Sequence, residues 1–167
     1  NRYYLGLSDG SNIGQLLVGG VYPIDDASAA GLEYLNLHMT DAYNEHAITA
    51  SYGRRMGTDF SLGANFKILV KKYAEDPYTS QNSVFLTYGY SKTRVALDLG
   101  ASYRWEDCAL ALVLTNFNQP NMGLAAEDPV TAGVRLGFAY RHDFMDFACD
   151  FARRMMPSYR ENWHHRL

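Results

Sequence analysis

The sequence predicts an all-β fold, an antiparallel up-and-down β-barrel that crosses a membrane. Apolar and polar side chains alternate with a period of two in residues 94–105, 59–71, 132–141 and 145–153. Successive side chains of a strand point to opposite faces, so each segment has one apolar face and one polar face. The polar face carries charged residues as well as Ser and Gly. That combination is typical of strands that separate lipid from a water-filled lumen.

Length and composition favour one folded domain that covers residues 1–167. The 13 Tyr and 8 Phe residues favour strands, and Tyr also favours the boundary between membrane and water. The longest unbroken apolar run, Cys108–Leu114, is far shorter than the roughly 18 residues of a transmembrane helix. The formal net charge of −3, without any block of like charge, argues against a nucleic-acid partner.

Nine strands and the start of a tenth follow one another along the chain. We expect them at Arg2–Leu7, Gly14–Ile24, Ala30–Met39, His46–Met56, Asp59–Lys72, Arg94–Trp105, Cys108–Phe117, Val130–Arg141 and Phe144–Met155, with the tenth beginning at Asn162. Most are near the roughly 9–11 residues that a tilted strand needs to cross a bilayer. Both ends of the sequence are abrupt, so we expect a fragment of a larger barrel, incomplete at both ends.

The connections are alternately short and long from residue 56 onward. Those at 56–58, 106–107 and 142–143 are tight, and Gly57 supplies a residue that tolerates a positive φ. Those at 73–92, 118–129 and 157–162 are long. This rhythm is typical of periplasmic turns and extracellular loops, although the sequence alone does not assign the two ends of the strands to the two sides of the membrane. In the longest connection, residues 84–90 fit a strand, a short helix or a segment folded into the lumen.

The alternation assigns side chains to two environments. We expect these polar residues to face the lumen: Lys67, Lys71, Arg94, Asp98, Arg104, Arg135, Arg141, Asp146 and Asp150. We expect these apolar residues to face lipid: Phe60, Leu62, Phe66, Ile68, Leu97, Leu99, Leu136, Phe138, Phe147 and Phe151. A charge held against lipid at mid-membrane costs a few kcal/mol, which is why the charges are placed inside. A mutually neutralising network is favoured over a polar conduit or a ligand contact.

Aromatic residues near the expected strand ends predict an interfacial girdle, made by Tyr52, Tyr103, Trp105, Tyr140 and Trp163. Ordinary packing in a soluble sheet is the alternative. Cys108 and Cys149 are in register with apolar neighbours and are interpreted as small apolar fillers. No catalytic constellation, cofactor motif or metal-ligand spacing is found, and we expect neither an enzyme nor a bound metal or cofactor.

Three segments resemble a known family. They are Ala50–Gly57 running into Phe60–Lys67, then Ala96–Arg104 followed by Leu114–Phe117, and finally Pro129–Val130 with Arg135–Arg141. Their order resembles the PorV and PorQ group of outer-membrane barrels in the FadL-like superfamily, over roughly residues 47–167. The resemblance implies about fourteen strands, location in a bacterial outer membrane, and contact with membrane lipid and lipopolysaccharide. It also implies that long loops contact other envelope or secretion proteins.

Three functions remain open. The favoured one is an envelope scaffold or an accessory to secretion and surface attachment, which predicts an obstructed lumen. The second is a channel for small hydrophobic molecules. The third is a soluble β-barrel that binds a ligand inside, which predicts that Phe60, Leu62, Phe66, Leu97, Leu99, Leu136 and Phe138 point inward and that the charges point outward.

Overall fold

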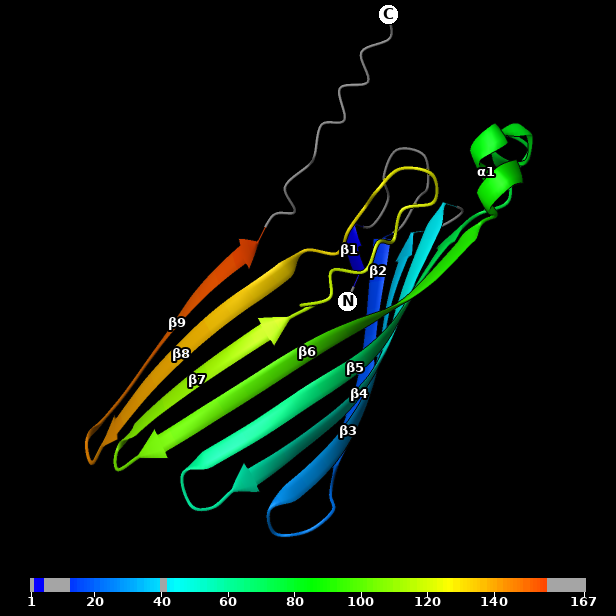
Figure 1. Cartoon of the computed structure of the whole chain (residues 1–167). Helices are drawn as coiled ribbons and strands as arrows, with labels where there is room; N and C mark the ends of the chain where they lie inside the picture. The colour runs from blue at the N-terminus through cyan, green and yellow to red at the C-terminus, as the bar shows by residue number, and fades with distance from the viewer. Residues whose placement is uncertain (1, 5–12, 40–41, 156–167) are drawn as a thin grey trace, which may run out of the picture.

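The protein is an all-β antiparallel sheet that curls into a half-barrel (Figure 1). The computed structural model describes residues 2–4, 13–39 and 42–155. Each described strand pairs with the next one along the chain. The strands are β1 (Arg2–Tyr4), β2 (Ile13–Pro23), β3 (Ser28–Met39), β4 (Tyr43–Met56), β5 (Phe60–Tyr73), β6 (Ser91–Trp105), β7 (Cys108–Thr115), β8 (Ala132–His142) and β9 (Met145–Met155).

The antiparallel up-and-down order predicted from the sequence is confirmed. Within the described residues the sheet has nine strands, with β1 and β9 at its two edges. The tenth strand expected from Asn162 onward lies outside the described residues, as do the loop at 157–162 and Trp163.

The expected start of β4 at His46 is wrong, because the strand begins at Tyr43. The polar residues just before His46 predict a connection between the two strands. Partners on β5 hold them in the sheet: the Tyr43 ring lies 5.3 Å from the Tyr73 ring, and Glu45 stands opposite Lys71 in the register. Cross-strand pairs of this kind stabilise a ladder at positions where local propensity does not require one.

Residues 74–90 form a short helical cap, with a 3₁₀ turn at Thr79–Gln81 and the helix α1 at Ser83–Tyr88. The helix begins where the Asn82 side chain accepts a hydrogen bond from the backbone N–H of Val84, and it ends at Gly89, whose φ is 75°. The Phe85 ring stacks on Tyr90 at 5.1 Å between centroids. Of the three possibilities for this segment, the short helix is the one observed. No helix in the described part of the chain is long and apolar enough to cross a membrane.

Two long connections, at 74–90 and 116–131, lie at one end of the sheet, opposite the tight turns at 57–59, 106–107 and 143–144 (Figure 1). The tight turns at 57–59, 106–107 and 143–144 define the turn end, and residues 74–90 and 116–131 define the loop end. Gly57 has a φ of 80°, as its place in the hairpin predicts, and Glu106 adopts a φ of 49° in the two-residue turn after β6. Positive φ in both hairpins matches the twist of the flanking strands.

We predict that Gly57→Ala lowers the free energy of unfolding by about 1 kcal/mol, because an L side chain is strained at positive φ. A Cβ at Gly57 would meet no atom within 4 Å, so the cost comes from the backbone alone. Gly20→Ala is the matched control, since its Cβ is equally free of contacts and its φ is not positive. Urea unfolding of both variants checks this, and equal stability of the two would contradict the hairpin geometry.

Candidate functional site

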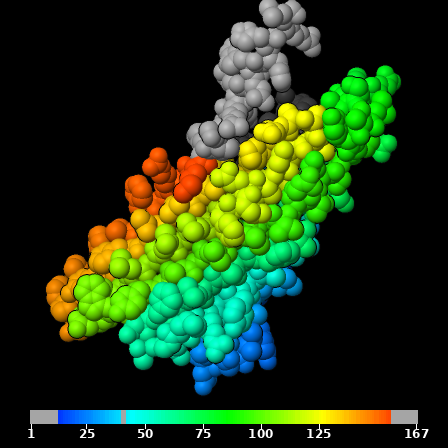
Figure 2. All heavy atoms as spheres, viewed as in Figure 1, coloured from blue at the N-terminus to red at the C-terminus, as the bar shows by residue number. Residues whose placement is uncertain are grey.

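The register of the sheet sorts its side chains into a convex and a concave face. All ten residues assigned to lipid share the convex face: Phe60, Leu62, Phe66, Ile68, Leu97, Leu99, Leu136, Phe138, Phe147 and Phe151. Many of them are open to the surroundings; Phe66 and Leu99 are each 47% exposed. Figure 2 shows neighbouring strands meeting side by side as one broad surface.

All nine residues assigned to the lumen share the concave face: Lys67, Lys71, Arg94, Asp98, Arg104, Arg135, Arg141, Asp146 and Asp150. Seven of them form ion pairs. Lys67 pairs with Asp98 and Lys71 with Asp128, and Arg135–Asp150 and Arg141–Asp146 join β8 to β9. This is the neutralising arrangement that the sequence predicts for much of the polar face.

The best-enclosed polar cluster lies on β5 and β6, halfway along the sheet. The Lys67 Nζ is 2.7 Å from Asp98 Oδ1 and donates a hydrogen bond to Asn116 Oδ1 at 2.6 Å. The Asn65 side chain donates to the second oxygen of Asp98 at 3.0 Å, and the backbone N–H of Asn116 donates to the first at 2.8 Å. Side-chain exposure is only 17% for Lys67 and 8% for Asp98. The cluster therefore holds both charges with their hydrogen-bonding capacity largely filled.

Asn116 and Asn118 turn the chain over this cluster. Asn116 has a φ of 48°, which ends β7. The Asn118 side chain then replaces a backbone partner of β6, since its Oδ1 accepts from Leu97 N–H and its Nδ2 donates to the Val95 carbonyl. Neither asparagine is among the site residues predicted from the sequence. Asparagine tolerates the left-handed conformation, so an Asn at the end of a strand is the signal that points to such a turn.

The following loop, residues 119–131, lies against the concave face. The Asp128 carboxylate accepts a hydrogen bond from Lys71 Nζ at 2.9 Å, and Met122 is only 6% exposed. The loop doubles back so tightly at Gly123 that a Cβ there would lie 1.8 Å from the Ala126 carbonyl oxygen. The sequence predicted a long connection at 118–129, and the structure shows it packed inward over β5.

Beneath this loop is a hollow of about 750 Å³ with a mixed lining. Lys67, Lys71 and Glu45 contribute charge, and Leu35, Leu37 and Leu69 contribute an apolar wall. Strands β2 and β3 carry apolar side chains on the concave face as well, so this part of the inner surface is less polar than the part formed by β5 to β9.

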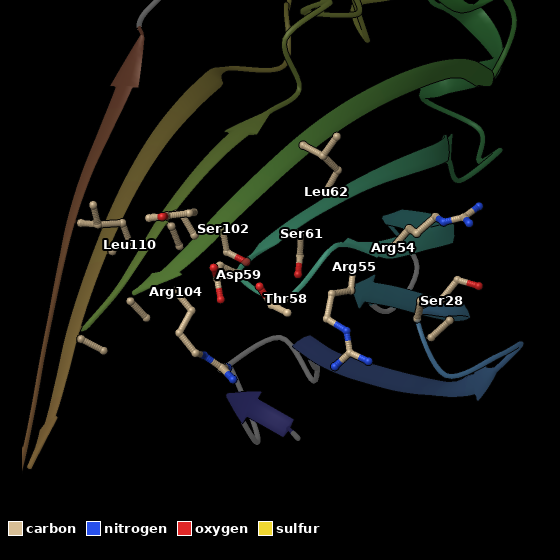
Figure 3. A pocket seen from close by; sticks show the side chains of 18 of the residues that line it. Ser28, Arg54, Arg55, Thr58, Asp59, Ser61, Leu62, Ser102, Arg104 and Leu110 are labelled. Carbon is tan, nitrogen blue, oxygen red and sulfur yellow. The ribbon is translucent and has the colours of Figure 1, made fainter. Parts of the chain in front are cut away.

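A second hollow of about 830 Å³ opens at the turn end (Figure 3). Ser61, Ser102 and Arg104 point into it, while Leu62 and Arg54 point away. Its floor is formed by small residues of β7 to β9: Ala109, Ala111, Gly137, Ala139 and Ala148. At its rim the Asp25 carboxylate accepts hydrogen bonds from the backbone N–H groups of Ala27 and Ser28. Hydrogen bonds from Ser28 and Ala27 hold the pKa of Asp25 below its usual value.

Three of the expected girdle residues, Tyr103, Trp105 and Tyr140, lie on the convex face within two residues of the end of their strand. Tyr52 is also convex, but its expected place near a strand end is wrong, because it lies opposite Ala64 and four residues before the end of β4. Tyr52 therefore lies within the apolar convex surface, away from both ends of the sheet.

Cys108 and Cys149 are free thiols on the convex face. They lie on β7 and β9, with β8 between them. Within the described residues, no group of three or more His, Cys, Asp or Glu side chains is arranged to hold a metal ion.

Comparison of the chain with protein-family models, curated proteins and solved structures finds no match.

We predict a strong energetic coupling between Lys67 and Asp98. Removing either charge alone leaves the other poorly solvated, which costs about 3 kcal/mol, whereas removing both costs less than the sum. The cycle of Lys67→Met, Asp98→Asn and the double variant, measured by urea unfolding, should give a coupling of about 2 kcal/mol. The exposed pair Arg141–Asp146 is the control, and its coupling should stay below about 0.5 kcal/mol. Equal coupling in the two pairs would contradict the enclosed cluster.

Proposed function

We propose that the chain forms part of the wall of a bacterial outer-membrane β-barrel of the PorV and FadL-like type. Within that wall it acts as an envelope scaffold or as an accessory to protein secretion and surface attachment. The observation that carries the proposal is the continuous apolar band on the convex face of the sheet, opposite a concave face that holds the ion pairs.

The height of the band fits a bilayer. On β5 the convex residues from Phe60 to Val70 are all apolar, and on β6 those from Val95 to Trp105 are as well. Ten residues at about 3.3 Å each span about 33 Å along the strand. A strand tilted by about 40° then covers about 25 Å of membrane depth, which is the height of the apolar band of outer-membrane barrels.

A soluble ligand-binding barrel requires the opposite arrangement, with apolar side chains enclosed by the curl and charges outside. Phe60, Leu62 and Phe138 lie on the convex face instead. In water the ten convex residues would present a large apolar surface, which soluble monomers rarely expose. Because the apolar side chains are outside the curl and the charges are inside it, lipid is favoured over water as the surroundings of the convex face.

The edges of the sheet indicate how the wall is completed. Open strand edges are not tolerated in lipid, because their N–H and C=O groups would lack partners. The edges formed by β1 and β9 therefore require further strands, in keeping with a larger barrel of about fourteen. The convex face of such a barrel would contact membrane lipid and lipopolysaccharide.

The inward loop favours the scaffold over an open channel. Residues 119–131 cover the concave face of β5, where Lys71 pairs with Asp128. Asn116 and Asp128 fix the segment to Lys67 and Lys71 of β5, and a segment held against the inner wall narrows the lumen at the loop end. The helical cap at 74–90 remains available at the same end for contact with another envelope protein.

Transport of a small hydrophobic molecule is the second candidate. The apolar wall of Leu35, Leu37 and Leu69, in the hollow beneath the loop at 119–131, favours transport. A channel would require the loop at 119–131 to move away from the concave face, whereas in a scaffold the loop would stay in place.

We predict that Leu99→Arg and Ser102→Arg differ strongly although both residues lie on β6. Leu99 is convex, so an arginine there would enter lipid and cost about 2–4 kcal/mol at mid-membrane. Ser102 is concave and lines the open hollow at the turn end. Membrane extraction and a heat-modifiability gel should show little folded Leu99→Arg protein and near-normal Ser102→Arg protein. If both variants fold equally well, the convex face does not contact lipid.

We also predict that the intact protein, reconstituted in planar bilayers, conducts little current, because the inward loop obstructs the lumen. Replacing residues 119–129 by a short Gly-Ser linker should produce steady conductance. A variant with the linker in place of residues 77–82, outside the hollow, is the control and should stay closed. Steady conductance of the unaltered protein would favour the channel over the scaffold.

A further inference from the structure

The convex face carries no carboxylate on any described residue of β2 to β9. The acidic residues of these strands all lie on the concave face: Glu33, Glu45, Asp98, Asp146 and Asp150. Basic residues occur on both faces, and the convex ones are Arg54, Lys72 and Arg153. Ion pairing inside a barrel explains acids on the concave face. It does not explain why none of the described strands places a carboxylate on the convex face beside these cations.

Lys72 belongs to a polar patch that crosses the strands at the loop end. The register places His38, Asn44, Lys72 and Ser91 in one convex row across β3 to β6. Asn36 and His46 form the adjoining row. These six residues are called the rim patch below. The next convex positions toward the turn end on β4 to β6 are Ile48, Ile68 and Val95, so the rim patch borders the apolar band.

Hydrogen bonds within the rim patch orient both imidazoles. The His46 Nδ1 accepts from the Tyr34 hydroxyl at 2.8 Å and from Asn36 Nδ2 at 3.1 Å. A nitrogen that accepts these bonds carries no proton, so the proton of His46 is on Nε2, where it can be donated to a ligand. His38 Nδ1 donates to Asn44 Oδ1 at 2.6 Å, which fixes the second ring.

We infer that the rim patch binds the phosphorylated headgroup of an outer-leaflet lipid, with the acyl chains lying on the apolar band beside Ile48 and Ile68. The inference rests on the proposed function, because it requires the convex face to stand in a membrane. Lys72 supplies the positive charge, and His46 supplies a hydrogen-bond donor to a phosphate oxygen. The absence of convex carboxylates in the described strands removes the repulsion that a phosphate would otherwise meet.

The long loops place the rim patch on the outer side of the membrane. Outer-membrane barrels have short turns on the periplasmic side and longer loops outside. The rim patch is at the end that carries residues 74–90 and 116–131. The leaflet at that side is the one that contains the phosphorylated glycolipid, and this selects a lipid headgroup over a phosphate free in solution.

The test measures binding of bisphosphorylated lipid A to the detergent-solubilised protein by native mass spectrometry. Lys72→Gln should weaken binding about fivefold, the effect expected for one lysine near an anionic lipid surface. Lys92→Gln is the matched control, because Lys92 lies on the neighbouring strand at the same end but faces the concave side, opposite Lys71. It should leave the affinity unchanged. Lipid A without phosphates should bind both proteins equally and more weakly.

Equal affinity of the Lys72→Gln and Lys92→Gln proteins for bisphosphorylated lipid A would overturn the inference, as would displacement of the lipid by an equal concentration of inorganic phosphate. Heat modifiability and membrane extraction are recorded for every variant. If the proteins insert normally and the two variants bind alike, only the headgroup site fails. If the unaltered protein does not insert into membranes, the proposed function and the headgroup site both fail.

Discussion

The register between adjacent strands is the constraint on which the rest of the structure depends. Side chains alternate between faces, so a shift of one residue would move a whole strand's apolar set to the other side. A slip of one residue on β6 would turn Asp98 to the convex face and Leu99 to the concave face. The pair with Lys67, the turn of Asn116 over that pair and the apolar band would be lost together. The register produces the charged and apolar faces, and the contacts within each face in turn stabilise this register over a shifted one.

Strand order and the division into faces follow from the sequence, because both depend on local alternation. Strand boundaries and the inward loop do not. The start of β4 at Tyr43 depends on Tyr73 and Lys71, which are on another strand. The loop position depends on Lys71 and Asp128, which are 57 residues apart. No local pattern encodes such contacts. Asn82 and Gly89, by contrast, are local signals for α1, although the short apolar run between them fits a strand equally well.

The concave face is divided along the sheet, and the division separates the two candidate functions. Strands β5 to β9 present mostly paired charges and small residues, whereas β2 and β3 present Leu17, Leu35 and Leu37. Most charges of the first part are neutralised by neighbours on the same face, which fits the interior of a structural barrel. The apolar part beside the inward loop is the surface from which a hydrophobic cargo would be recognised. The same loop covers the border between the two parts, so in the proposed barrel its position would decide between an obstructed and an open lumen.

The orientation of the two faces relative to lipid is tested most directly by spin labels scanned along β6 in a Cys108→Ser, Cys149→Ser background. Labels at residues 94–104 of the bilayer-reconstituted protein are compared for collision with oxygen, which enters lipid, and with a water-soluble nickel chelate. We expect a period of two, with oxygen collisions highest at positions 95, 97 and 99 and nickel collisions highest at 94, 98 and 102. The opposite phase, or equal access of the chelate to both faces, would contradict a membrane-facing convex surface.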